Sequence, residues 1–175
     1  PMPPCRIGHG YDLHRLEPGA PEGAGRPFVL GGILFDHPTG PIGHSDGDAV
    51  LHAVTDALLG ALGEPDIGQL FPDDDPQLEG AQSDVFLSEA VRRVEDRGFA
   101  LGNIDITVIC ERPKIGPRKD EMCARIAAIL GCERDQVNLK GKTHEGVDAI
   151  GEGKAVEVHV VALLVSGDER AKDHS

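Results

Sequence analysis

The chain has 175 residues, 39% of them hydrophobic, a size typical of one domain that buries its own core. Its formal net charge of −13 disfavours binding to DNA or RNA, which needs clustered lysine and arginine. No apolar stretch is long enough to span a bilayer, and the opening PMPPCRIGHG resembles no targeting segment. We therefore expect one domain over residues 1–175, cytoplasmic, with neither nucleic acid nor membrane as a partner. A plastid location would require a removed transit peptide.

The predicted elements alternate between strands and helices. Two strands come first, and a loop rich in proline and glycine joins them. A helix follows and ends near Gly63, and a long loop then leads to a helix capped by Ser83 and closed by Gly98. The predicted ranges are strands at 5–14, 28–35, 103–113, 136–143 and 154–166, and helices at 46–62, 83–98 and 117–131. This order predicts a two-layer α/β sandwich.

The last predicted strand is apolar on both sides. Val156, Val158 and Val160 alternate with Glu157 and His159, but the end of the strand is apolar at every position. An open sheet face of this kind needs a covering partner, and self-association would supply one. The four cysteines form no CxxC pair, so we expect free thiols rather than a zinc knuckle or a redox motif.

The segment YDLH places Asp12 and His14 two residues apart, so that an extended strand points both side chains to one side. His52 on the first helix would complete a set of three nitrogen and oxygen ligands, which is typical of an open zinc site. Asp56, one turn later, could accept the other ring N–H of His52 and orient it. Taken singly, an Asp-x-His pair is commonplace, and a lone histidine on a helix more often belongs to ordinary packing or to the surface than to a metal site.

The segment HSDGD lies at the expected start of the first helix. Ser45 and Asp48 have the spacing of a capping box, which explains those two residues but not His44. His44 and Ser45 are alternatively candidate donors to an anion at the positively polarised helix N-terminus.

The segment GKT at 141–143 resembles the end of a phosphate-binding loop, but Gln136 stands where that motif requires glycine. Lys142, Thr143 and Glu145 could instead engage phosphate or an oxygen-preferring metal, although polar residues at a strand end are ordinary. The run DDDP could chelate a cation or be merely solvated. The segment ERPK could expose backbone groups that read a base edge, or form a simple turn.

Five segments together resemble the 2-C-methyl-D-erythritol 2,4-cyclodiphosphate synthase family of the non-mevalonate isoprenoid pathway. They are RIGHGYDLH, GHSDGDAVLHAVTDALLGALG, DIGQLFPDDDP, LGNIDITVICERPK and KGKTHEGVDAIGEG, and the match spans roughly residues 6–165. The resemblance implies an α/β fold in which a mixed sheet carries helices on one face. It also implies a homotrimer whose sheets pack around the threefold axis, with active sites between neighbouring subunits.

The resemblance implies a CMP-forming lyase that converts 4-diphosphocytidyl-2-C-methyl-D-erythritol 2-phosphate to the 2,4-cyclodiphosphate. One zinc ion per site would bind Asp12, His14 and His52, and Glu145 would bind magnesium or manganese. His44 and Thr143 would act in catalysis. Implied substrate-binding residues are Ser45, Asp66, Gly68, Phe71, Asp73, Asp75, Cys110, Lys114 and Lys142.

The chain departs from the common bacterial pattern after Lys142, where Thr143 and His144 replace a run of threonines. The segment GVDAIGEG also lacks the phenylalanine and arginine of the bacterial GFTGRGEG. Because of this difference, the resemblance does not imply that an isoprenoid diphosphate binds in the cavity along the threefold axis. It leaves the implied synthase chemistry intact. Two other classes share some of these features: a zinc hydrolase, which needs a general base beside the metal, and a non-catalytic trimeric binding protein.

Overall fold

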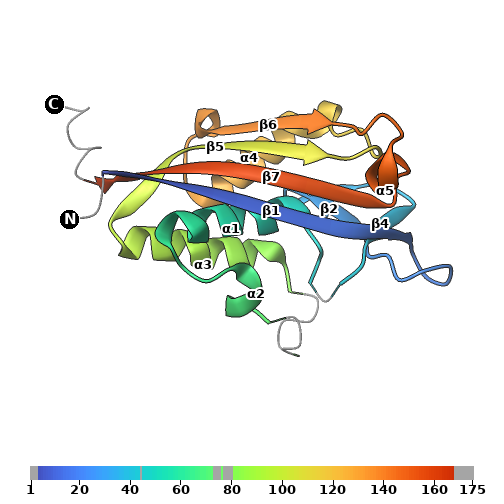
Figure 1. Cartoon of the computed structure of the whole chain (residues 1–175), viewed down its shortest axis with the longest axis horizontal. Helices are drawn as coiled ribbons and strands as arrows, with labels where there is room; N and C mark the ends of the chain where they lie inside the picture. The colour runs from blue at the N-terminus through green and yellow to red at the C-terminus, as the bar shows by residue number, and fades with distance from the viewer. Residues whose placement is uncertain (1–3, 44, 73–75, 77–80, 168–175) are drawn as a thin grey trace.

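The structure is a computed structural model that describes residues 4–43, 45–72, 76 and 81–167 (Figure 1). Its strands are β1 (Cys5–Pro18), β2 (Phe28–Leu30), β3 (Ile33–Phe35), β4 (Thr39–Pro41), β5 (Phe99–Ile109), β6 (Val137–Lys142) and β7 (Ala155–Ser166). Its α-helices are α1 (Ala49–Leu62), α2 (Ile67–Leu70), α3 (Ser83–Asp96), α4 (Lys119–Leu130) and α5 (Asp148–Gly151). Two single turns of 3-10 helix, η2 (Gly116–Arg118) and η3 (Arg134–Gln136), precede α4 and β6.

The main sheet has five strands in the order β4-β1-β7-β5-β6 (Figure 1). Strands β5 and β6 are parallel, and the other neighbours are antiparallel. The predicted mixed sheet with helices is therefore confirmed. Strand β7 lies between β1 and β5, so β1 and β5 do not pair with each other. This strand order separates the two pockets that are described below.

The helices α1, α3 and α4 cover one face of the sheet, and in Figure 1 helix α4 passes behind β5 and β7. On that face Val156, Val158 and Val160 of β7 are fully buried. On the opposite face Val161 of β7 is 49% exposed and Ile7 of β1 is 71% exposed. The sheet thus has a buried face beneath the helices and an open, partly apolar face, as the alternation along its strands requires.

The segment FVLGGILF is a hairpin rather than the single predicted strand. Gly31 and Gly32 have φ values of +60° and +73°, and strands β2 and β3 pair antiparallel on either side of them. Two consecutive residues with positive φ are what a tight two-residue hairpin turn needs, and glycine adopts that conformation without a steric cost. The two glycines inside an apolar run were the sequence signal for this turn.

Helix α1 begins one turn later than the capping-box spacing predicts. Its N-cap is Asp48, whose side chain accepts hydrogen bonds from the backbone N–H groups of Val50 and Leu51. Ser45 lies outside the helix, and its hydroxyl accepts from the N–H of Gly47 at 3.2 Å. Similarly, the N-cap of α3 is Gln82, and Ser83 is the first helical residue rather than the cap.

Strand β5 begins at Phe99 and ends at Ile109, four residues earlier at each end than the predicted range of 103–113. The residues from Cys110 to Lys114 therefore form a loop after the strand. The backbone groups of this loop lie outside the regular ladder, apart from the N–H of Cys110, which donates to the carbonyl of Lys142.

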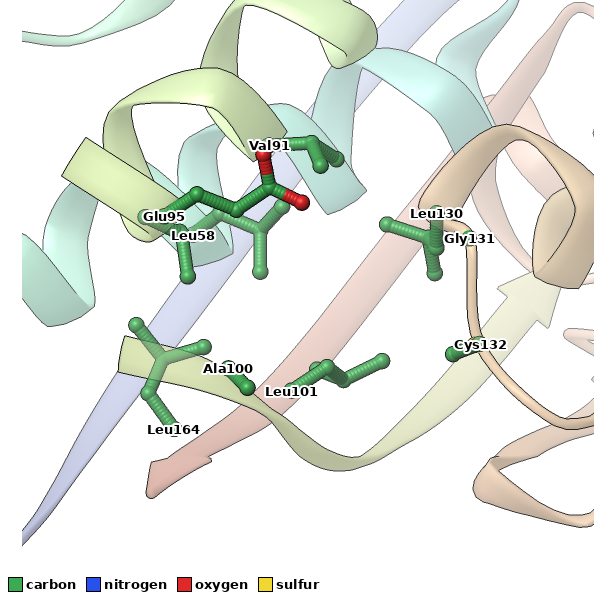
Figure 2. A pocket seen from close by; sticks show the side chains of 10 residues that line it. Leu58, Val91, Glu95, Ala100, Leu101, Leu130, Gly131, Cys132 and Leu164 are labelled. Carbon is green, nitrogen blue, oxygen red and sulfur yellow. The ribbon is translucent and has the colours of Figure 1, made fainter. Parts of the chain in front are cut away.

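A small cavity of about 80 Å³, lined mostly by apolar side chains, lies between the helices and the sheet (Figure 2). Leu58, Val91 and Leu130 on the helices face Leu101 and Leu164 on the sheet. Glu95 contributes the only charged side chain to this lining. The cavity adjoins the start of β5 and the end of β7, at the opposite end of the strands from the residues discussed next.

Candidate metal centre and substrate pockets

Three predicted ligands meet where strand β1 faces helix α1. The Oδ2 atom of Asp12 lies 3.0 Å from Nδ1 of His14 and 3.2 Å from Nδ1 of His52. One ligand atom from each of the three residues lies within 4.8 Å of the others. All three side chains are largely buried, with His52 only 12% exposed. The predicted same-side placement of Asp12 and His14, and their meeting with His52, are both confirmed.

Glycines on β1 let the helix approach closely enough for this meeting. A Cβ atom on Gly10 would lie 1.7 Å from the carbonyl oxygen of Ala53, and one on Gly8 would lie 1.8 Å from that of Ala57. Both distances are far below any normal contact, so only glycine fits beneath α1 at these two positions. Ala53 directly follows His52, and the close approach therefore brings His52 within reach of Asp12.

The electrostatics of the three groups favour a bound cation. Burial raises the pKa of Asp12, but the imidazoles of His14 and His52 outweigh burial and lower it to about 2. Burial lowers the pKa of His52, but Asp12 and nearby carboxylates raise it above its ordinary value. Asp12 Oδ2 and His14 Nδ1 are buried; they form an ion pair at 3.0 Å, but neither atom has a hydrogen bond of good geometry within the described part of the chain. Buried polar atoms rarely stay unsatisfied, so this set fits a metal ion.

The second ring nitrogen of His52 is held by Ser83. His52 Nε2 lies 2.8 Å from the Ser83 hydroxyl, which donates its own proton to Asp46 Oδ1. The backbone N–H of Ser83 also donates to Asp46, at 3.0 Å. Because the only hydroxyl proton of Ser83 goes to Asp46, the Nε2–H of His52 donates to Ser83. The lone pair of neutral His52 is then on Nδ1, which faces Asp12.

This arrangement differs from the expectation that Asp56 orients His52. The Oδ1 atom of Asp56 accepts a hydrogen bond from the backbone N–H of Ile67 at 2.8 Å and so anchors the start of α2. Ser83 and Asp46 take the orienting position instead. Asp46 stood in the HSDGD segment, but Ser83 comes 31 residues after His52, and no local pattern links them.

Asp48 fixes the beginning of α1, and with it the position of His52 one turn later. The carboxylate of this fully buried residue accepts from Gly31 N at 2.9 Å and Gly32 N at 2.6 Å, as well as from Val50 and Leu51 at the helix start. Burial raises the pKa of Asp48, while these backbone bonds oppose that rise. One carboxylate thus ties the β2–β3 hairpin to the helix that carries the third ligand.

The three ligands line a pocket of about 350 Å³, here called the triad pocket. Ser45, Gly68 and Phe71, which the sequence predicts to bind substrate, also line it. Asp66 is not part of this lining, because its side chain caps α2 by accepting from Gln69 N at 2.9 Å. His44, Asp73 and Asp75 lie outside the described residues. Arg15, which sequence reasoning did not identify, adds a cationic side chain to the pocket.

A second pocket of about 520 Å³, here called the lysine pocket, lies where β5 and β6 end. It brings together four predicted residues, Cys110, Lys114, Lys142 and Thr143. Lys119, at the start of α4, is a third lysine there; it lies five residues after Lys114, but no motif in the sequence singled it out. Glu145 follows the pocket; its φ is +53°, and its backbone N–H donates to Thr143 Oγ1 at 3.4 Å.

The two pockets share no lining residue. Strand β7 also separates β1, which carries two of the metal ligands, from β5, which leads to the lysine pocket. The fold and the site therefore define an α/β enzyme with a metal-binding triad in one pocket and a cationic pocket elsewhere on the same chain.

Comparisons with known proteins identify the family. A family model described as YgbB family matches residues 5–165. A chloroplastic 2-C-methyl-D-erythritol 2,4-cyclodiphosphate synthase from Arabidopsis thaliana is 52% identical over 162 residues, covering 93% of this chain and 68% of that protein. A synthase of the same name from Thermosynechococcus vestitus is 46% identical over 166 residues, covering 95% and 99%. The IspF protein of Plasmodium falciparum, solved with CDP, matches with a TM-score of 0.82 and 36% identity, covering 95% and 99%.

The chain belongs to the YgbB family of 2-C-methyl-D-erythritol 2,4-cyclodiphosphate synthases. Its activity is the CMP-forming conversion of 4-diphosphocytidyl-2-C-methyl-D-erythritol 2-phosphate to the cyclic 2,4-diphosphate. The resemblance that the five sequence segments indicated is therefore confirmed.

Proposed function

We propose that Asp12, His14 and His52 hold one zinc ion per active site, and that Glu145 holds a magnesium or manganese ion. The buried, unbonded atoms of Asp12 and His14 carry the zinc assignment. Nitrogen and oxygen ligands with an open position are the set that catalytic zinc uses, whereas a carboxylate oxygen suits the harder second ion. When bound, the two ions supply positive charge that neutralises the phosphate oxygens of the substrate.

The reaction joins two anionic groups of one molecule. An ionised oxygen of the 2-phosphate attacks the β-phosphorus, the bond from that phosphorus to the bridging oxygen breaks, and CMP leaves with this oxygen. Because the nucleophile is already ionised, the protein needs no strong base. Its tasks are to hold the two phosphates in line and to stabilise the charge that develops.

The lysine pocket gathers positive charge in a chain that is acidic as a whole. Lys114, Lys119 and Lys142 gather there in a protein of net charge −13. We assign Lys114 and Lys142 to the diphosphate and the loop from Cys110 to Lys114 to the cytosine base. Two of the solved relatives contain CDP, which supports a cytidine nucleotide as the ligand.

Thr143 and His44 are assigned to the charge that develops at the reacting phosphate. Thr143 lines the lysine pocket, and its hydroxyl accepts from the backbone N–H of Glu145, the residue proposed to hold the second ion. The assignment of His44 rests on the sequence, as do those of Asp73 and Asp75. Ser45, Gly68 and Phe71 are assigned to the erythritol and phosphate side because they line the triad pocket. Asp66 is assigned to the ribose from its place in the family motif.

We further propose a homotrimer in which a neighbouring chain completes each active site. Two observations support it. The triad pocket and the lysine pocket are separate on one chain, although the reaction needs both sets of residues at one substrate. The open sheet face also exposes Ile7, Tyr11, Leu13 and Val161, and such an apolar surface needs cover.

The compartment remains a prediction. The Arabidopsis relative is named as chloroplastic, and other relatives are bacterial. None of the helices in the described part of the chain combines the length and apolar character needed to cross a membrane. We keep the cytoplasm as the predicted location, and likewise the prediction that no nucleic acid binds.

The first experiment is phosphorus NMR of the substrate with wild-type protein and with His52→Ala, magnesium being present. A cyclic diphosphate and CMP that form with wild type and disappear with His52→Ala would support the assigned site. A linear phosphate product would favour a hydrolase. A folded, zinc-loaded wild type that binds substrate but releases nothing would favour a binding protein.

A second variant separates the two ions. Glu145→Ala should lower turnover while zinc, measured by elemental analysis, stays at the wild-type amount. The matched control is Glu152→Ala, which removes an exposed carboxylate that pairs with Lys154. Normal turnover of Glu145→Ala would contradict the role given to this residue.

A further inference from the structure

The open face of the sheet carries a polar cluster that the proposed reaction does not use. His9 and Tyr11 of β1 lie beside Glu157 and His159 of β7, and the two strands run side by side (Figure 1). Tyr11 is the direct cross-strand partner of His159, and the ring centroids are 5.0 Å apart. His9 pairs with Val161, which makes His9 and His159 diagonal neighbours on one face.

The two imidazoles face each other through one nitrogen each. His9 Nε2 lies 3.2 Å from His159 Nδ1. The other nitrogen of His159, Nε2, lies 2.7 Å from Glu157 Oε1. An ionised carboxylate only accepts hydrogen bonds, so the neutral His159 carries its proton on Nε2 and its lone pair on Nδ1, directed at His9.

We propose that His9 and His159 bind a borderline transition-metal ion such as Zn²⁺, Ni²⁺ or Cu²⁺, with Glu157 as the carboxylate that orients His159. Two imidazole nitrogens at about 2.0–2.1 Å from one ion stand roughly 2.9 Å apart in square-planar geometry and roughly 3.4 Å apart in tetrahedral geometry. The observed separation of 3.2 Å falls between these values. A carboxylate on the far nitrogen of a ligating histidine is the usual support of such a ligand.

The pair is preorganised for this role without any change in net proton count. In the metal-free protein His9 donates from Nε2 to the Nδ1 lone pair of His159. Binding needs only that the His9 proton moves to its own Nδ1, since both rings stay neutral. In one chain the side chain of Glu157 is 19% exposed and that of His159 is 41% exposed, so the carboxylate is the more shielded of the two. In the proposed trimer a neighbouring chain faces the metal position.

This site is distinct from the triad. His9 and His159 lie on the open face of the sheet, whereas Asp12 and His14 point toward α1. Within the described residues this chain contributes two nitrogen ligands, so water or a neighbouring chain completes the coordination. The inference goes beyond the proposed reaction, and neither depends on the other.

The test is to count zinc sites per chain by calorimetric titration of chelator-treated protein in the presence of magnesium. Wild type should bind two zinc ions, while His9→Gln and His159→Gln should each bind one and keep synthase activity. The His52→Ala/His159→Gln double variant should bind none. Glu157→Gln should weaken the second site about 10-fold to 100-fold and leave the first unchanged. His37→Gln, an imidazole outside both clusters, is the matched control and should bind two.

A second measurement needs no variant. Long-range ¹H–¹⁵N NMR of histidine-labelled wild type should show His9 Nε2 and His159 Nδ1 shifting when the second equivalent of zinc is added. A single zinc site in wild type, two sites surviving in the His9→Gln variant, or unshifted nitrogens at saturating zinc would each overturn the proposal. The phosphorus NMR experiment with His52→Ala reads the synthase site separately, so failure of one result does not imply failure of the other.

Discussion

Strand β1 presents a histidine cluster on each of its two sides, and the fold treats the two very differently. On the inner side, Asp12 and His14 are covered by α1 and meet His52, whose ring is held by Ser83. On the outer side, His9 meets His159 on a face that the described part of the chain leaves open. Side chains two residues apart share a face and adjacent ones do not, so a single strand can serve two sites that never touch.

The difference shows what makes the inner cluster the stronger site. Its ligands come from two elements held together by close glycine contacts, and the orienting hydrogen bonds are partly buried. The outer cluster depends on two neighbouring strands and one carboxylate. Supporting contacts, rather than the count of histidines, therefore distinguish the two sides, and four experiments test this view.

The largest effect should come from replacing, one at a time, two histidines of strand β1 by alanine. His14→Ala removes a ligand of the inner cluster and should lower the rate of CMP formation about 10³-fold or more, because metal charge stabilisation is worth several kcal/mol and about 1.4 kcal/mol is tenfold. His9→Ala, five residues away on the outer side, should stay within about twofold of wild type. Coupled CMP assays measure both. Equal losses would abolish the distinction between the two sides.

Close packing of α1 on β1 should be the next most sensitive feature. Gly10→Ala places a methyl group 1.7 Å from the Ala53 carbonyl and should destabilise the protein by about 3 kcal/mol. In contrast, Gly60→Ala on the exposed side of α1 should stabilise it by about 0.5–1 kcal/mol, because glycine is the poorer helix former. Denaturant unfolding at one protein concentration tests both. Gly10→Ala at wild-type stability would mean that the close approach is not needed.

The orienting hydrogen bond on His52 gives a smaller, specific effect. Ser83→Ala should weaken zinc binding about 10-fold to 100-fold, since it removes the partner of His52 Nε2. Asp56→Asn keeps an acceptor for Ile67 and should leave zinc affinity near the wild-type value. Competition with a zinc chelator measures both constants. The reverse outcome would restore Asp56 as the orienting residue.

The smallest effect concerns thiol reactivity. Cys5 lies exposed on the outer side of β1. Cys110 is buried, and burial raises the pKa of its thiol to about 12. Its S–H group donates a hydrogen bond to the carbonyl of Arg112. At pH 8 iodoacetamide should alkylate Cys5 well before Cys110, because the thiolate is the reactive form. Peptide mass spectrometry follows the two sites. Rapid labelling of Cys110 in the folded protein would contradict its burial.

Local patterns predicted the features that depend on a few adjacent residues. Asp12 and His14 share a side because strand period is two, and the helical run after residue 48 carries His52 on a predictable turn. The hairpin at Gly31 and Gly32 carried a readable signal that the single-strand prediction passed over. The start of α1 was shifted because Ser45 and Asp48 are both good caps, and contacts with the hairpin select Asp48.

Features that join distant segments came only from the tertiary structure. Ser83 reaches His52, and Lys119 reaches Lys142, through packing of whole elements. His9 meets His159 because β1 and β7 pair in one particular register. No short window of sequence contains these partners.

The sequence by itself determined the family, the order of the larger strands and helices, the metal-binding triad, and Lys114 and Lys142 of the lysine pocket. It could do so because backbone periodicity and motif spacing are local properties. Only the tertiary structure decided which residues orient His52, that one chain keeps its two pockets apart, and that a second histidine pair faces the open side of the sheet. These depend on strand order and register, which are set by how the whole chain buries its apolar surface.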